Sequence, residues 1–169
     1  MSANGNTKYR RPGLHVLVVD DDPSVLRDTS ARLGAEGYKV SMFSRANGVG
    51  QLVRVLRPEV LLIDVLMPDM SKRLLLELLA TCRNSEEQPI VILHSRLAPR
   101  MLRTLVNVGN AAGVIQKTRN DVEFSLAFNA IVERASSPEA RFLNAMSGTH
   151  RIATVSEEDL EELRTGSTH

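Results

Sequence analysis

The chain has 169 residues, of which 43% are hydrophobic and 24% are charged, and its formal net charge is +1. This length favours one domain with some additional sequence, and the composition is typical of a protein with a packed core. The balanced charge gives no reason to expect a nucleic acid or a membrane surface as partner. No apolar run approaches the roughly 20 residues that cross a bilayer, and residues 1–13 lack the apolar segment of a signal peptide. We therefore expect a cytoplasmic protein whose single cysteine, Cys82, is a buried thiol.

The chain opens with a flexible, mildly basic segment over residues 1–13, followed by an apolar run, 15–19, of strand type. That run ends in three consecutive aspartates, Asp20 to Asp22. An aspartate followed by proline is a common helix start, so we assign Asp22 as the cap of a first helix that ends near Gly37.

The elements that follow alternate between apolar runs and segments with helical spacing of apolar residues. A helix over 46–57 is weakened by two glycines, whereas the next helical segment, 71–83, is strongly apolar. The expected strands are 38–43, 60–65, 89–95 and 113–117, and the expected helices after the first are 46–57, 71–83, 98–109 and 119–135. Five strands alternating with five helices predict an α/β fold with an open parallel sheet covered on both faces.

The last part of the chain, 136–169, has a different character, and Pro138 marks the change. It contains few β-branched runs and is too short for a second packed domain of its own. A cap-like Ser156 opens a short helical pattern over 156–164. Two interpretations remain open: a disordered tail with a nascent helix, or a helix that docks on a partner or on the domain itself.

Polar side chains stand at the ends of four of the expected strands. Asp20 and Asp21 follow the first strand, Asp64 ends the third, His94 and Ser95 end the fourth, and Lys117 ends the fifth. Because the carboxyl ends of parallel strands share one edge of a sheet, these groups converge. Crowded carboxylates favour a divalent cation, and hard oxygen ligands suit Mg²⁺. A carboxylate beside that cation can act as a nucleophile toward phosphorus, with the Lys117 ammonium pairing with a phosphoryl oxygen.

Residues 14–135 resemble the receiver (CheY-like) domain of bacterial two-component response regulators. The resemblance rests on VVDDDP at 18–23, LLIDVLMP at 61–68, Ser95 and Lys117. It implies a flavodoxin-like three-layer sandwich with a five-stranded parallel sheet of order 2-1-3-4-5. It also implies a phosphoprotein of a phosphorelay rather than an enzyme. Its partners would be a histidine kinase or phosphotransfer protein and a downstream protein, and homodimers through the fourth and fifth helices are common in that family.

The resemblance also implies the role of each site residue. Asp64 would accept the phosphoryl group, and Lys117 would pair with that group. Mg²⁺ would be bound by Asp20, Asp21 and Asp64 together with the backbone carbonyl of Leu66, and Asp20 would act mainly through water.

Two neighbouring residues compete for the hydroxyl position of the family. Counting from Asp64 favours His94, whereas counting back from Lys117 favours Ser95. Chemistry favours Ser95, because a hydroxyl donates a hydrogen bond to a phosphoryl oxygen. Ser95 would then swing toward the phosphoryl group, and His94 would point to the other side of the strand, since neighbours alternate. His94 then has a packing role or a part in tuning hydrolysis.

Four departures make this an atypical receiver. The pair Ser71-Lys72 stands where the family has Asp/Asn-Gly, and Arg96 replaces a small residue and would modulate access to Asp64. Val114 takes the place of a switch aromatic. Thr118 replaces a proline, so we expect a trans peptide bond before it.

Three other functions differ from that of a phosphoacceptor. A pseudo-receiver, which is an interaction module independent of phosphorylation, is the main alternative. A DNA-binding output domain is not expected, because residues 136–169 lack a basic recognition helix. An aspartyl-phosphate hydrolase would use Asp20 and Asp22, but the helix that starts at Pro23 leaves no room for a cap domain or a substrate loop.

Overall fold

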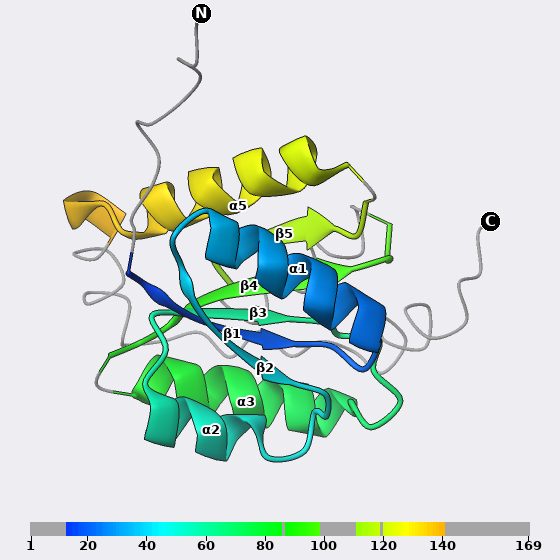
Figure 1. The fold of residues 1–169 in the computed structure, drawn as a ribbon. Helices are drawn as coiled ribbons and strands as arrows, with labels where there is room; N and C mark the ends of the chain where they lie inside the picture. Colours follow the sequence, from blue (N-terminus) through cyan, green and yellow to red (C-terminus); the bar gives the residue numbers. More distant parts are fainter. Residues whose placement is uncertain (1–12, 86, 99–110, 119, 141–169) are drawn as a thin grey trace, which may run out of the picture.

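Figure 1 shows a computed structural model, which describes residues 13–85, 87–98, 111–118 and 120–140. Its elements are β1 (His15–Val19), α1 (Pro23–Ala35), β2 (Lys39–Phe43), α2 (Val49–Leu56), β3 (Val60–Ile63), α3 (Lys72–Asn84), β4 (Ile90–Ser95), β5 (Gly113–Gln116) and α5 (Asp121–Ala135). The helix expected over 98–109 and the one expected over 156–164 lie outside the described residues, apart from Ala98. No helix in the described ranges has the length and apolar character needed to span a bilayer.

The five strands form one parallel sheet in the order β2-β1-β3-β4-β5. Helices α1 and α5 cover one face, and α2 and α3 cover the other (Figure 1). The alternation along β3 shows how both faces are buried: Leu61 and Ile63 pack toward α2 and α3, whereas Val60 and Leu62 pack toward α1 and α5. The flavodoxin-like three-layer sandwich and its strand order are therefore confirmed.

The start of α1 follows from the sequence DDDP. Asp22 Oδ1 accepts hydrogen bonds from the backbone N–H of Ser24 at 2.8 Å and of Val25 at 3.4 Å, and Pro23 occupies the first helical position. The Ser24 hydroxyl also donates to Asp22 Oδ1. This hydrogen bond has the largest effect on the pKa of Asp22, and together with the backbone hydrogen bonds it lowers that pKa. The assignment of Asp22 as the helix cap is confirmed.

Several element boundaries differ from the prediction. Helix α2 begins at Val49 rather than at residue 46, because Gly48 has a left-handed backbone with φ of +93° and cannot continue a helix. Strand β3 ends at Ile63 and β5 ends at Gln116, which is short of the predicted ends in both cases. Asp64 and Lys117 therefore follow their strands, at the start of loops on the carboxyl edge.

Gly113 opens β5 beneath α5, where no side chain fits. A Cβ at this position would lie 2.7 Å from Ile131 Cδ1 and 2.8 Å from Ile131 Cγ1. We expect Gly113→Ala to lower the free energy of unfolding by about 1–3 kcal/mol, because Ile131 must move within a packed core. Urea denaturation measures this loss. In an Ile131→Ala background the same substitution should cost much less, and equal costs in the two backgrounds would contradict the proposed clash.

Candidate functional site

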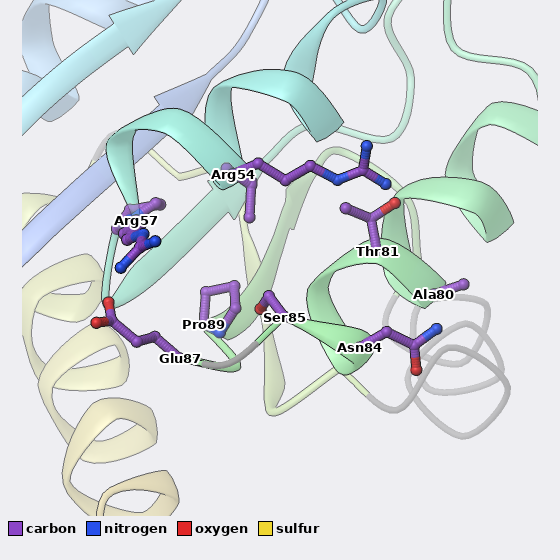
Figure 2. A pocket seen from close by; sticks show the side chains of 10 residues that line it. Arg54, Arg57, Ala80, Thr81, Asn84, Ser85, Glu87 and Pro89 are labelled. Atoms are coloured by element: carbon purple, nitrogen blue, oxygen red, sulfur yellow. The ribbon is translucent and has the colours of Figure 1, made fainter.

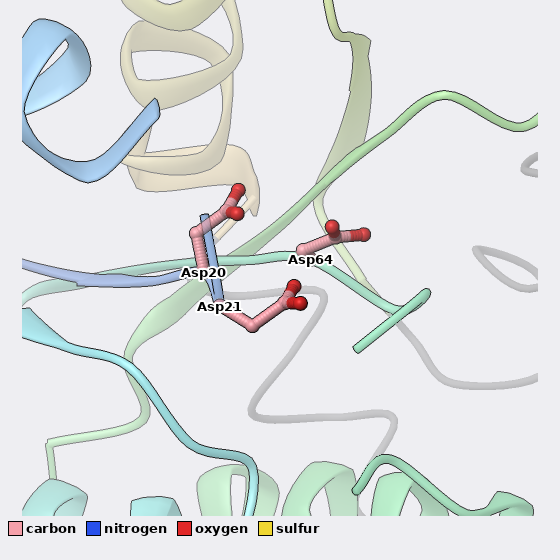
Figure 3. A group of neighbouring side chains, drawn as sticks. All are labelled: Asp20, Asp21 and Asp64. Atoms are coloured by element: carbon pink, nitrogen blue, oxygen red, sulfur yellow. The ribbon is translucent and has the colours of Figure 1, made fainter. Parts of the chain in front are cut away.

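Three carboxylates meet at the carboxyl edge of the sheet. Asp20 and Asp21 follow β1, and Asp64 follows β3, whose pairing with β1 sets Val19 opposite Ile63. One oxygen from each of the three side chains lies within 4.8 Å of the other two. Figure 3 shows the three carboxylates around a common space at the ends of these strands. The predicted convergence of these aspartates is present in the structure.

Lys117 reaches the same cluster from the end of β5. Its Nζ lies 2.5 Å from Asp64 Oδ2, to which it donates a hydrogen bond, and 2.6 Å from Asp20 Oδ2. The contact with Asp20 is an ion pair outside hydrogen-bond angles. The Lys117 backbone N–H donates to the Ser95 carbonyl at 2.9 Å and so ties the loop after β5 to the end of β4. The ammonium thus bridges two buried carboxylates.

The two oxygens of Asp64 have different surroundings. Oδ1 accepts a hydrogen bond from the Leu66 backbone N–H at 2.8 Å, whereas Oδ2 faces the ammonium of Lys117. The Asp64 side chain is 6% exposed. The amide fixes the orientation of the carboxylate, and Oδ2 faces the centre of the site.

The charges of the cluster do not balance. Asp20 is buried, and this burial raises the pKa of its carboxyl above the ordinary value. Its Oδ1 accepts a hydrogen bond from the Asp22 backbone N–H at 3.0 Å. When Asp20, Asp21 and Asp64 are ionised, three carboxylates face one ammonium, which leaves an excess of two negative charges. The donor set, all carboxylate oxygens with one exposed member, fits a small hard cation such as Mg²⁺.

Ser95 and Arg96 stand at the end of β4, close in sequence but in different surroundings. Ser95 is fully buried, and its Oγ has no hydrogen-bond partner among the described residues. Arg96 is exposed, and its guanidinium lies 3.7 Å from Asp22 Oδ2, so it faces the start of α1. Neither side chain forms a hydrogen bond or an ion pair with Asp64 in the described part of the chain.

His94 points to the opposite side of β4 from Leu93, as expected from strand alternation. Its ring meets the Phe124 ring of α5 edge-on, with centroids 5.4 Å apart. Burial, followed by the nearby charge of Lys117, lowers the pKa of His94 to about 4. His94 is therefore a neutral core residue next to the acidic cluster.

This shift predicts a pH dependence of stability. Between the ordinary pKa of 6.5 and the folded value of about 4, unfolded His94 binds a proton that folded His94 does not. Above pH 6.5, His94 is neutral in both states and costs no stability. As the pH falls from 6.5 toward 4, proton binding to the unfolded state lowers the free energy of unfolding by at most about 1.4 kcal/mol per pH unit. His94→Phe keeps a ring against Phe124 but cannot titrate. Urea denaturation across this range should show a weaker loss in the variant, and parallel curves would contradict the assignment.

The structure adds one residue that sequence reasoning missed. Asp69 Oδ2 accepts hydrogen bonds from the backbone N–H of Ala46 at 2.9 Å and of Asn47 at 3.2 Å. These bonds fasten the loop after β3, which follows Asp64, to the loop before α2. The contact spans more than twenty residues of sequence, so no local pattern signals it.

The structure also describes the other three positions at which the sequence departs from the family pattern. Ser71 caps α3, because its Oγ accepts a hydrogen bond from the Leu74 backbone N–H at 3.1 Å, and Lys72 is the first residue of that helix. Val114 packs against the core beneath α2 and α3. The described residues contain no cis peptide bond, so the bond before Thr118 is trans as expected.

Comparison with known proteins identifies the family. Residues 16–128 match the family described as the response regulator receiver domain. Over 81 residues the chain is 32% identical to the transcriptional regulatory protein KdpE of Mycobacterium tuberculosis and 31% identical to the DNA-binding response regulator MtrA of Mycolicibacterium smegmatis. These matches cover 48% of this chain and only 34% of each relative, so the chain aligns with about a third of their length.

Solved structures agree in fold. The chemotaxis response regulator CheY4 of Vibrio cholerae is 20% identical, with a TM-score of 0.62 and coverage of 70% of this chain and 98% of that one. The signal receiver domain of an HD domain-containing protein from Pseudomonas fluorescens Pf-5 is 22% identical at the same TM-score, with coverage of 82% and 98%. Since the family match spans most of the chain, and the sheet order is the expected one, the protein belongs to the response regulator receiver domain family.

Proposed function

We propose that this chain is a phosphoacceptor: Asp64 takes a phosphoryl group from the phosphohistidine of a histidine kinase or phosphotransfer protein. The observation that carries the proposal is the cluster of Asp20, Asp21 and Asp64, with the Lys117 ammonium 2.5 Å from Asp64 Oδ2. Structural ion pairs of a core would not leave an excess of negative charge at an exposed edge.

The surroundings of Asp64 support a specific chemical step. Oδ1 is held by the Leu66 amide, so Oδ2 is the proposed nucleophile, and the Lys117 ammonium that donates to Oδ2 moves to the phosphoryl group as Oδ2 attacks phosphorus. A P–O bond forms to Asp64 while the P–N bond of the phosphohistidine breaks, and its electron pair remains on the imidazole. Lys117 then pairs with an oxygen of the transferred group. The Ser95 hydroxyl, which has no hydrogen-bond partner among the described residues, donates to another oxygen after a change of side-chain rotamer.

Mg²⁺ is the proposed cofactor of this site. The carboxylates of Asp20, Asp21 and Asp64 and the backbone carbonyl of Leu66 would hold it, and Asp20 would act mainly through water. The ion supplies positive charge that neutralises the oxygens of the phosphoryl group. Arg96, whose guanidinium lies near Asp22, would modulate access of the phosphodonor. His94, which packs against Phe124, would modulate the site from within the core.

Residues 14–135 are proposed as the receiver domain, with 1–13 and 136–169 outside it. We place the protein in the cytoplasm, where it signals through contact with a downstream protein. The end of α5 at Ala135 supports the proposed C-terminal bound.

The test is phosphoryl uptake from a small donor. The chain is incubated with acetyl phosphate and Mg²⁺, and its intact mass is measured. We expect an increase of one phosphoryl group that disappears when EDTA removes the metal.

The alternative is a pseudo-receiver that acts without phosphorylation. One observation favours it: the Lys117 ammonium forms ion pairs with the buried carboxylates of both Asp20 and Asp64, so these two groups have a cationic partner that is not a metal. Absence of any adduct with acetyl phosphate, together with unchanged behaviour of Asp64→Ala in cells, would support the pseudo-receiver and refute the phosphoacceptor.

A further inference from the structure

A second polar site lies at the opposite edge of the sheet. A groove of about 420 Å³ opens between the last turns of α2 and α3 (Figure 2). Its floor includes Pro58, which precedes β3, and Pro89, which precedes β4. The acidic cluster stands at the other end of the same strands. Six residues of extended chain separate Pro58 from Asp64, or roughly 20 Å, so the groove is distinct from the phosphorylation site.

The groove carries cations without acidic partners. Arg54 and Arg57 both line it from α2, and neither guanidinium is within 4.0 Å of a carboxylate in the described part of the chain. Figure 2 shows Arg54 extending across the groove toward Thr81 of α3. The Thr81 hydroxyl donates to a backbone carbonyl of its own helix, so the two guanidiniums and the Asn84 amide are the donors available to a ligand.

The backbone conformation of Arg57 is a separate reason to assign a function to its side chain. Arg57 has φ of +46° and is the only non-glycine residue with positive φ within the described ranges. It caps the carboxyl end of α2, a position where glycine avoids the strain of a left-handed backbone. Arginine therefore occupies a position at which glycine would fold more easily, and strain of this kind gathers at functional sites.

We propose that this groove binds a sugar phosphate, free or as part of a nucleotide. Arg54 and Arg57 extend to opposite sides of the groove in Figure 2, and both would rotate toward a phosphate bound between them, for which the planar fork of a guanidinium is suited. Glu87, on the wall of the groove, accepts hydrogen bonds from sugar hydroxyls, and its negative charge disfavours a second phosphate beside it. Val53 and the two buried prolines form an apolar floor for the sugar or the base. The volume is within the range of pockets for small molecules.

The test is a titration of the full chain with ribose 5-phosphate and with AMP, in EDTA so that the acidic cluster holds no metal. Backbone amide NMR shifts identify the site, and ribose and inorganic phosphate are the comparison probes. We expect saturable shifts around Arg54 and Arg57, with ribose 5-phosphate binding more tightly than ribose or inorganic phosphate. Tighter binding of AMP assigns a nucleotide as the ligand, and equal binding assigns the free sugar phosphate.

Variants separate binding from folding. Arg54→Gln and Arg57→Gly should each weaken binding by about tenfold or more, since each removes hydrogen bonds to a charged group. Arg57→Gly should leave the thermal midpoint equal or higher, because glycine relieves the backbone strain. Arg83→Gln, an exposed arginine of α3 outside the groove lining, and Asp64→Asn should both bind like the parent. No saturable shift at millimolar probe, or unchanged affinity in Arg54→Gln and Arg57→Gly, would overturn the proposal and leave the phosphoacceptor function untouched.

Discussion

Asp64→Asn is expected to reduce phosphoryl uptake from acetyl phosphate to background. The substitution preserves the size of the side chain and an oxygen that accepts from the Leu66 backbone N–H. It removes the charge and the nucleophilic oxygen that face Lys117, so no P–O bond can form at this position. Intact mass after incubation with acetyl phosphate and Mg²⁺ measures the loss.

Asp28→Asn is the matched control, because Asp28 is an exposed aspartate on α1, away from the acidic cluster. This variant should take up phosphoryl groups at the rate of the parent. Undiminished uptake by Asp64→Asn would mean that another residue is the acceptor.

Phe128→Ala is expected to lower the free energy of unfolding by about 3–5 kcal/mol, the usual cost of truncating a buried phenylalanine. Phe128 is a residue of α5 and is fully buried between this helix and the sheet. Its ring stacks on Phe124 with centroids 5.8 Å apart and meets Tyr38 edge-on at 5.3 Å. Truncation leaves a cavity at the centre of this row of rings, and urea denaturation measures its cost.

Leu126→Ala tests whether burial, rather than helix composition, determines the loss. Leu126 is on the same helix but 53% exposed, and alanine is at least as good a helix former as leucine. Its cost should be within about 0.5 kcal/mol. Similar losses in the two variants would contradict the description of the core.

The sequence predicts most of the sheet because its strands are continuous apolar runs with distinct ends. The apolar run at residues 15–19 predicts the first strand, where β1 is found, since charged residues follow it directly. The convergence of Asp20, Asp64 and Lys117 follows from topology alone: parallel strands present their carboxyl ends at one edge. Asp22 as the cap of α1 follows from the proline after it.

Other features depend on contacts between distant parts of the chain, which a single sequence does not reveal. The row of rings from His94 through Phe124 and Phe128 to Tyr38 joins β4, α5 and the start of β2. The hydrogen bond from the Ala46 backbone N–H to Asp69 depends on the position of the loop before α2. Periodicity marks such residues as buried or turn-forming, but their partners are set by the packing of the whole fold.

The most direct measurement of the central claim is the position of the phosphoryl group. The chain is phosphorylated with acetyl phosphate and Mg²⁺, treated with borohydride, which reduces an acyl phosphate of aspartate to homoserine, and digested for peptide mass mapping. Homoserine at position 64 alone is the predicted result. Homoserine at position 20 or 21, or at no position in a chain that has gained a phosphoryl group, would contradict it.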